Sequence, residues 1–166
     1  MSTLAWLPPR FDRATFSTIT DLEQAAWTVY QKDFATPPKF RSENVGIVSR
    51  PHKARPDRGH TYWHMITEGE PEETRTHPMV DRLERLPWTR PVIENEGDTA
   101  AAIKVWANER HGNTHVCIWF DQQNYIVVLK QCASHYLLRT TYCPESKRRL
   151  QLHREYAAWK KSGARL

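Results

Sequence analysis

The chain has 166 residues, of which 39% are hydrophobic and 26% charged, and it contains seven tryptophans. This length is enough for one domain with its own core, and the composition excludes a disordered polypeptide. Lysine and arginine outnumber aspartate and glutamate by 24 to 19, and the net charge of +5 favours polyanions such as nucleic acids as partners.

The cysteine pattern and the hydropathy bear on the compartment. Cys117, Cys132 and Cys143 have neither CxxC nor metal-ligand spacing, which favours a reducing environment. No apolar run approaches the ~20 residues needed to span a bilayer, and the first residues carry no signal-peptide pattern. We therefore expect a cytoplasmic protein with no membrane partner.

Residues 1–38 are expected to form an extended segment and one helix that belong to the same fold as the rest. Thr20 or Asp21 can cap this helix, and apolar residues such as Leu22 and Tyr30 recur on one face. The proline pair at 37–38 ends the helix because proline lacks an amide hydrogen. The following residues, up to 49, are expected to enter the core as a strand or an extended pair.

A basic segment and two histidines follow. Residues 50–59 hold two prolines and several basic side chains, among them Arg58, so a surface loop is expected. It leads into a short predicted strand, on which His60 and His64 would face the same way. Two imidazoles can serve as general base and general acid near neutral pH. They could instead bind zinc, although no HExxH or carboxylate cluster completes a site, or be ordinary structural histidines.

The middle of the chain is expected to contain short elements only. Residues 71–76 are a polar linker, and residues 79–86 form a helical turn or two that carries Arg85. The prolines at 87 and 91 interrupt this helix. A short apolar anchor at 92–93 precedes a loop that reaches residue 101.

Four apolar runs then predict an antiparallel meander. They are rich in β-branched and aromatic residues, and the gaps between them have hairpin length, which leaves no room for parallel crossovers. The runs are 103–107, 115–120, 125–129 and 135–142. With the helices they predict an α+β fold with a sheet of four to five antiparallel strands. Alternation places Arg139 and Thr141 on one face, the candidate working surface.

Residues 144–163 predict a basic C-terminal helix. Leu152, Tyr156 and Trp159 form an apolar stripe at helical spacing. The opposite face is basic and includes Arg148 and Arg149. This face is either a simple solvated surface or a contact for phosphate.

The absence of common catalytic motifs narrows the chemistry. The sequence contains no GxSxG, no glycine-rich phosphate loop, no Rossmann fingerprint and no clustered pair of carboxylates. Because a two-metal nuclease needs clustered carboxylates, we expect any phosphodiester chemistry to need neither metal nor cofactor. Such chemistry requires RNA, whose 2′-hydroxyl supplies the nucleophile.

The order of these segments resembles the superfamily that groups barnase, EndoU, colicin D and RelE, often called the BECR fold. It is most similar to the branch found in phages and polymorphic toxins. The segments that carry the resemblance are Gly-His-Thr-Tyr-Trp-His-Met-Ile at 59–66, Glu-Arg-Leu-Pro-Trp at 84–88, Tyr-Ile-Val-Val-Leu at 125–129, Tyr-Leu-Leu-Arg-Thr-Thr-Tyr at 136–142 and the helix at 148–156. The resemblance covers roughly residues 40 to 160 and implies a nuclease domain over 39–166.

What the resemblance implies is a metal-independent endoribonuclease, associated with a toxin or a phage. Carried over by position, His60 or His64 would be the acid/base and Arg139 would stabilise the negative charge of the phosphorane. Thr141 or Tyr142 would orient the phosphate. The last strand departs from the family pattern, since no small residue separates its threonine from its tyrosine.

The expected partners follow from this resemblance. RNA, with tRNA as one candidate, would contact four arginines, and an active enzyme would need a cognate antitoxin or immunity protein. The four arginines are Arg58, Arg85, Arg148 and Arg149. An alternative is a non-catalytic RNA- or protein-binding module on the same fold, with Tyr62, Trp63 or Trp88 exposed for base stacking. A further alternative is a protein-interaction domain in a phage particle.

Overall fold

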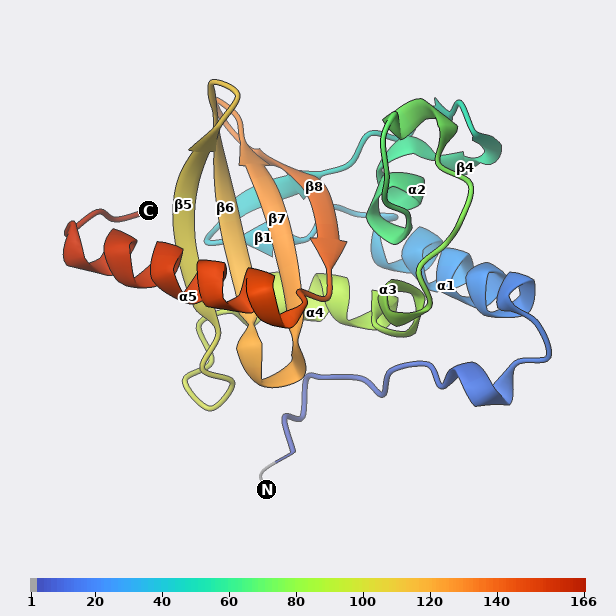
Figure 1. The fold of residues 1–166 in the computed structure, drawn as a ribbon, viewed down its shortest axis with the longest axis horizontal. Helices are drawn as coiled ribbons and strands as arrows, with labels where there is room; N and C mark the ends of the chain where they lie inside the picture. The colour runs from blue at the N-terminus through green and yellow to red at the C-terminus, as the bar shows by residue number, and fades with distance from the viewer. Residues whose placement is uncertain (1–2) are drawn as a thin grey trace.

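A curled six-stranded sheet organises the computed structural model, which describes residues 3–166 (Figure 1). The strand order is β1-β2-β8-β7-β6-β5. The strands of this sheet are β1 Lys39–Phe40, β2 Glu43–Gly46, β5 Lys104–Arg110, β6 Asn113–Phe120, β7 Tyr125–Gln131 and β8 Tyr136–Tyr142. The predicted α+β class is confirmed, and strands β5 to β8 form the antiparallel meander.

The helices surround this sheet. They are α1 Ile19–Asp33, α2 His60–Ile66, α3 Val80–Glu84, α4 Thr89–Glu94 and α5 Ser146–Lys161, with 3-10 turns η1 Arg13–Thr15, η2 Glu72–Thr74, η3 Leu86–Trp88 and η4 Asp121–Gln123. No helix within residues 3–166 has the length and apolar character that crossing a bilayer requires.

The sheet is larger than predicted and is mixed. Strand β2 pairs with β8 in parallel, with Val45 opposite Tyr136, so the expectation of four to five antiparallel strands was wrong in count and in polarity. The meander rule applies only to strands joined by short gaps. Strands β2 and β8 are separated by most of the chain, and therefore no hairpin constrains their direction.

The segment that carries the two histidines is a helix, so the predicted strand at this position was wrong. Helix α2 spans His60–Ile66, and the six residues after His60 are all buried. A short apolar run that is buried on every side gives no period by which a helix differs from a strand. The segment before it, predicted as a loop, forms the hairpin β3 Pro51–His52 and β4 Arg55–Gly59.

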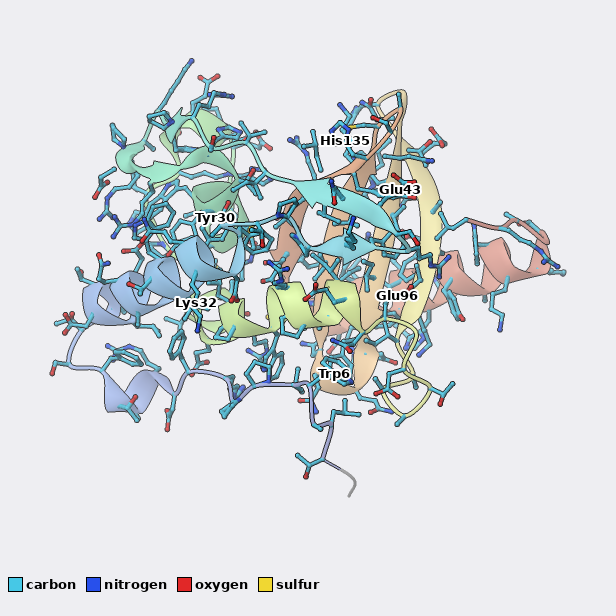
Figure 2. The ribbon with its side chains drawn as sticks, turned by 180° about the vertical axis from the view of Figure 1, so that it is seen from behind. Trp6, Tyr30, Lys32, Glu43, Glu96 and His135 are labelled. Atoms are coloured by element: carbon cyan, nitrogen blue, oxygen red, sulfur yellow. The ribbon has the colours of Figure 1, made fainter. Side chains whose placement is uncertain are left out.

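The two faces of the sheet are covered by different elements. Seen from behind, helix α4 and the curled end of the sheet formed by β1 and β2 lie in front of strands β5 to β8, and α1 lies beside them (Figure 2). Residues from α1, α2, α4 and the back face of the sheet share one core. Tyr62, Trp63 and Trp88 are buried in it, and they therefore cannot serve as the exposed stacking platforms that the binding-module alternative required.

The front face is covered only in part. Helix α5 crosses β5, β6 and β7 (Figure 1) and places Leu152 against a second small core. The other buried members of that core are Trp106, Cys117, Trp119 and Ile126. Helix α2 packs beside the edge of β8, and the front face between α5 and α2 is left open.

Candidate active site

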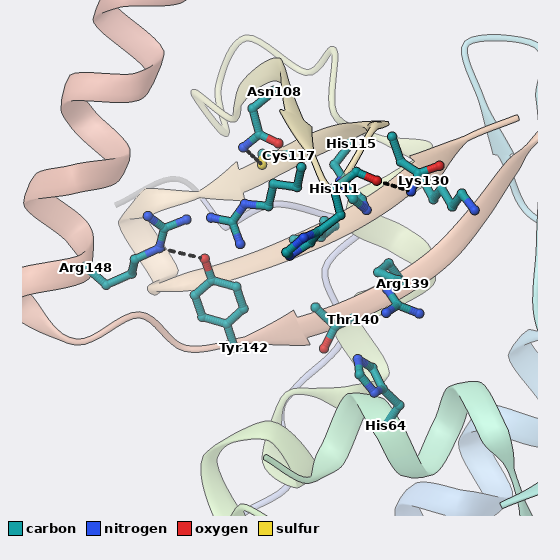
Figure 3. Close-up of a pocket in the computed structure, with 13 residues that line it drawn as sticks. His64, Asn108, His111, His115, Cys117, Lys130, Arg139, Thr140, Tyr142 and Arg148 are labelled. Carbon is teal, nitrogen blue, oxygen red and sulfur yellow. Dashed lines mark hydrogen bonds between the residues drawn. The ribbon is translucent and has the colours of Figure 1, made fainter. Parts of the chain in front are cut away.

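A cavity of ≈ 380 Å³ opens on the uncovered part of the front face (Figure 3). Strands β5 to β8 form its floor, and α2 and α5 contribute one side chain each, His64 and Arg148. Arg110, Lys130 and Arg139 also line it, and none of the lining residues that the structure describes is acidic. The wall of the cavity therefore holds four permanent positive charges and no carboxylate; within residues 3–166, Arg148 alone among the four pairs with a carboxylate behind the wall, that of Glu155. This excess of positive charge favours an anionic ligand.

A β-bulge in β8 decides which of its side chains reach the cavity. Val128 pairs with Thr140 and Leu129 with Leu138, so Arg139 is the extra residue of β8. An extra residue inverts the alternation of the strand beyond it. Arg139 and Thr140 consequently both line the cavity.

Thr141 was predicted to share the face of Arg139, and this was wrong. Its side chain is 1% exposed and lies at the hydroxyl of Tyr125, which is also 2.7 Å from Thr89 Oγ1. The bulge turns Thr141 into the core, whereas a strict period of two placed it outside. Thr140 occupies the position that the sequence assigned to Thr141.

His64 reaches the cavity from α2 and projects towards Arg139 and Thr140 (Figure 3). Its side chain is 10% exposed, and burial lowers its pKa to about 4, although the carboxylate of Glu72 acts in the opposite direction. Nδ1 of His64 lies 2.9 Å from Nη1 of Arg75 and also 2.9 Å from Oε1 of Glu72. His64 is therefore a neutral imidazole at physiological pH, the state required of a general base.

His60 lies one helical turn before His64 but opens onto a neighbouring cavity of ≈ 380 Å³. The rings of His52, His60 and His64 are nearly parallel, with centroids 5.3 and 6.4 Å apart. Burial lowers the pKa of His60 as well, and Nε2 of His60 lies 3.3 Å from Oε1 of Glu72. Arg139 lines both cavities and joins them.

Besides His111 in the turn between β5 and β6, the main cavity holds a further histidine, His115, and the sequence singled out neither of them. His115 lies on β6 opposite Lys130 of β7, and burial, followed by the charge of Arg139, lowers its pKa. The alternation of β6, which puts His115 on the face of Cys117, could have identified it. Lys130 was missed because the predicted strand stopped one residue before it.

Tyr142 and Arg148 are joined at the end of the cavity next to α5. Nε of Arg148 donates to the hydroxyl of Tyr142 over 3.1 Å, and its Nη1 donates to Glu155 over 2.8 Å. Burial raises the pKa of Tyr142, so the phenol keeps its proton and can donate it in a hydrogen bond. Both residues were among the predicted site residues.

The other three predicted RNA contacts lie outside the cavity. Arg58 is enclosed by a buried ion pair with Glu23. Arg85 donates from Nη1 to the carbonyl oxygen of Asp81 over 3.1 Å, and Arg149 is bound to Asp121 at 2.8 Å. The sequence identified these side chains as basic, but the partners of Arg58 and Arg149 come from distant parts of the chain.

Three comparisons bear on the identity of the chain. No family model, no curated protein and no solved structure gives a significant match. Within residues 3–166, no group of three or more histidine, cysteine, aspartate or glutamate side chains is arranged to hold a metal ion. The chemistry of the cavity is therefore the basis on which a function is assigned.

Proposed function

We propose that the protein is an endoribonuclease of the BECR type that cleaves RNA without a metal ion. In this reaction the 2′-hydroxyl of one nucleotide attacks the adjacent phosphate, and the bond to the 5′-oxygen of the next nucleotide breaks. The 2′-hydroxyl proton passes to a base, and the 5′-oxygen receives a proton from an acid. The products are a 2′,3′-cyclic phosphate and a 5′-hydroxyl end.

The observation that supports this proposal is that His64 and His115, two of the three histidines that line the cationic cavity, both lie in its wall with Arg139; the third is His111. His64 comes from α2 and His115 from β6, and Arg139 lines the cavity with both. Burial lowers the pKa of each ring, so an unprotonated base is available. A bound phosphate raises the pKa of a nearby histidine, which supplies a protonated acid in the same site.

The positive charges of the cavity suit the transition state of this reaction. A pentacoordinate phosphorane carries more negative charge than the phosphodiester, and preorganised cations stabilise it. The guanidinium group of Arg139 can bind two phosphate oxygens at once. Arg110, Lys130 and Arg148 supply further charge, and Thr140 and Tyr142 supply hydroxyl groups that orient the phosphate.

The biological setting belongs to the same proposal. An enzyme that degrades RNA, with tRNA as one candidate substrate, acts in the cytoplasm and threatens the cell that makes it. The proposal therefore includes a toxin or phage-associated role and a cognate inhibitor protein that covers the cationic cavity. An acidic surface on that inhibitor would match the charge of the cavity.

Cleavage of total cellular RNA by the purified protein in excess EDTA tests the proposal. The wild type is expected to give fragments that end in 2′,3′-cyclic phosphate. His64→Ala and Arg139→Ala are expected to be slower by about 10²–10⁴-fold, as is typical for an acid/base or an electrostatic donor. His77→Ala is the control, because His77 is an exposed histidine that lines neither cavity.

The result decides between this function and the alternatives. RNA left intact by the wild type overturns the nuclease proposal. Salt-sensitive RNA binding by the inactive protein would then support a non-catalytic binding module. The absence of RNA binding as well would support a protein-interaction domain.

A further inference from the structure

The segment between α2 and α3 brings two opposite charges to one nitrogen of His64. Nη1 of Arg75 and Oε1 of Glu72 both lie 2.9 Å from Nδ1. A ring nitrogen either accepts a hydrogen bond through its lone pair or donates one through its proton. Arg75 can only donate and Glu72 can only accept, so each of them suits a different tautomer of the neutral ring.

The two tautomers differ in whether Nε2 of His64 donates or accepts a hydrogen bond. When Nδ1 accepts from Arg75, the proton of the neutral ring is on Nε2, which can then only donate. When Nδ1 carries the proton and donates it to Glu72, Nε2 keeps a free lone pair and can accept a proton. Only the second tautomer can act as a general base through Nε2.

Glu72 is placed to accept a hydrogen bond from a proton on Nδ1 of His64. Its Oε1 is buried and makes no hydrogen bond within the described residues, although it lies close to both His60 and His64. A buried carboxylate oxygen without a donor is costly. A proton on Nδ1 of His64 would satisfy it after a small rotation of the ring or of the carboxylate.

We propose that Glu72 is a positioning residue that selects the base-competent tautomer of His64, in competition with Arg75. The catalytic meaning of this selection rests on the proposed ribonuclease function. Glu72 does not touch the substrate, and it accepts the Nδ1 hydrogen while Nε2 takes the proton of the 2′-hydroxyl. The carboxylate then stabilises the imidazolium that forms.

The other groups that face the two histidines cannot replace Glu72 as a negatively charged hydrogen-bond acceptor. His64 faces Arg75, which belongs to the same segment between α2 and α3 as Glu72. It also faces Arg139 of β8 and His60 of its own helix. His60 also faces His52 and Arg50. The three arginines lower the pKa of the histidine or histidines that they face, whereas Glu72 raises the pKa of both His60 and His64.

Nitrogen NMR of the histidine rings in the free protein tests the selection directly. Glu72→Ala is expected to shift the neutral ring of His64 towards the Nε2–H tautomer and to lower its titration midpoint by about one pH unit or more. Arg75→Gln should change both quantities in the opposite direction. Glu72→Asp should restore part of the wild-type behaviour, because the charge is retained.

Glu73→Ala is the matched control, because Glu73 is the next residue and its partner is Lys53, at 3.8 Å on the surface. It should leave the tautomer and the midpoint of His64 unchanged. The exposed ring of His77 serves as an internal reference, and the backbone amide spectrum verifies that each variant is folded. An unchanged His64 in folded Glu72→Ala, or an equal change in Glu73→Ala, overturns the inference.

Cleavage kinetics separate this inference from the function on which it rests. Glu72→Ala should reduce kcat by roughly 10²-fold with little change in KM, as expected when the orienting partner of a catalytic histidine is lost. If the wild type cleaves RNA and Glu72→Ala is equally fast, the inference fails and the function stands. If the wild type cleaves no RNA, the function fails, and the NMR experiment still decides whether Glu72 controls His64.

Discussion

Arg58 and Glu23 form a buried bidentate ion pair between β4 and α1. Nε and Nη2 of Arg58 donate to the two carboxylate oxygens of Glu23 over 2.7 and 2.8 Å. The two side chains are 7% and 3% exposed, and the hydroxyl of Tyr62 lies 2.9 Å from Glu23 Oε1. The guanidinium group that the sequence suggested for RNA is thus bound inside the protein, where it connects α1, α2 and β4.

Glu23→Gln should strongly destabilise the protein. The substitution preserves the shape of the side chain but removes the buried counter-ion of Arg58 and leaves it only the exposed carboxylate of Asp57, 3.1 Å from Nη1. Breaking a buried ion pair by removing one partner costs about 3–5 kcal/mol. Urea denaturation at neutral pH should therefore show a decrease of that size in the free energy of unfolding.

The exposed pair Lys53–Glu73 is the control for this experiment. The charged atoms are 3.8 Å apart on the surface, and exposed pairs contribute at most about 1 kcal/mol. Glu73→Gln should therefore leave the unfolding transition nearly unchanged. Equal effects of the two substitutions would contradict the structural role assigned to Arg58 and Glu23.

The fold was predictable where the determining interactions are local. Strands β5 to β8 follow from alternation and from hairpin-length gaps, and α5 follows from its apolar stripe and basic face. The parallel pairing of β2 with β8 depends on a contact between Val45 and Tyr136. Neither short segment contains a local sequence pattern that predicts this contact, because it forms only when the whole chain is folded.

The site was predictable in part for the same reason. His64, Arg139, Tyr142 and Arg148 were identified by residue type and meet in one cavity. The face of Thr141 depends on a bulge, which is a property of the register between two strands and not of one sequence. The role inferred for Glu72 could not be predicted either, since it lies in a polar linker whose path is set by tertiary contacts.

Thr140 and Thr141 should respond differently to replacement by valine. Thr140 lines the cavity, and loss of a hydrogen bond to a charged phosphate costs about 1.5–3 kcal/mol, so Thr140→Val should reduce kcat/KM about tenfold or more. Thr141 is buried beside the hydroxyl of Tyr125. Thr141→Val should lower the thermal midpoint and leave the rate of the folded protein unchanged.

Measurement of kcat/KM and Tm for both variants at one temperature tests this assignment. The two effects are on different observables, so each variant is the control for the other. A slow but stable Thr141→Val together with a fully active Thr140→Val would restore the original sequence prediction. It would also contradict the position of the bulge in β8.

The stability of the protein should fall as the pH is lowered from about 6.5 towards 4. Burial lowers the pKa of His64 from 6.5 to about 4. Between these pH values His64 is therefore protonated in the unfolded chain and neutral in the folded protein. Stability is therefore complete above pH 6.5 and is lost as the pH falls, by about 3 kcal/mol from this group. His60 and His115 have lowered pKa values as well and add to the same trend.

His64→Gln tests this dependence, because glutamine does not titrate. Urea denaturation at several pH values between 7 and 4.5 should give a shallower loss of stability for this variant than for the wild type. His77→Gln removes an exposed histidine and should retain the wild-type slope. A slope that His64→Gln does not change would show that His64 is not buried in the neutral form.

Arg148 and Arg149 are adjacent in sequence and should differ in their effect on RNA binding. Each of them has a carboxylate partner at 2.8 Å, Glu155 for Arg148 and Asp121 for Arg149, but only Arg148 lines the cavity. Each phosphate contact on a single strand contributes about 0.7 to the slope of log K against log salt concentration. Arg148→Gln should lower the affinity for a non-cleavable 2′-deoxy oligonucleotide and reduce this slope by about one such step, while Arg149→Gln should retain the wild-type slope. Equal slopes for both variants would place the bound strand across the surface of α5 and outside the cavity.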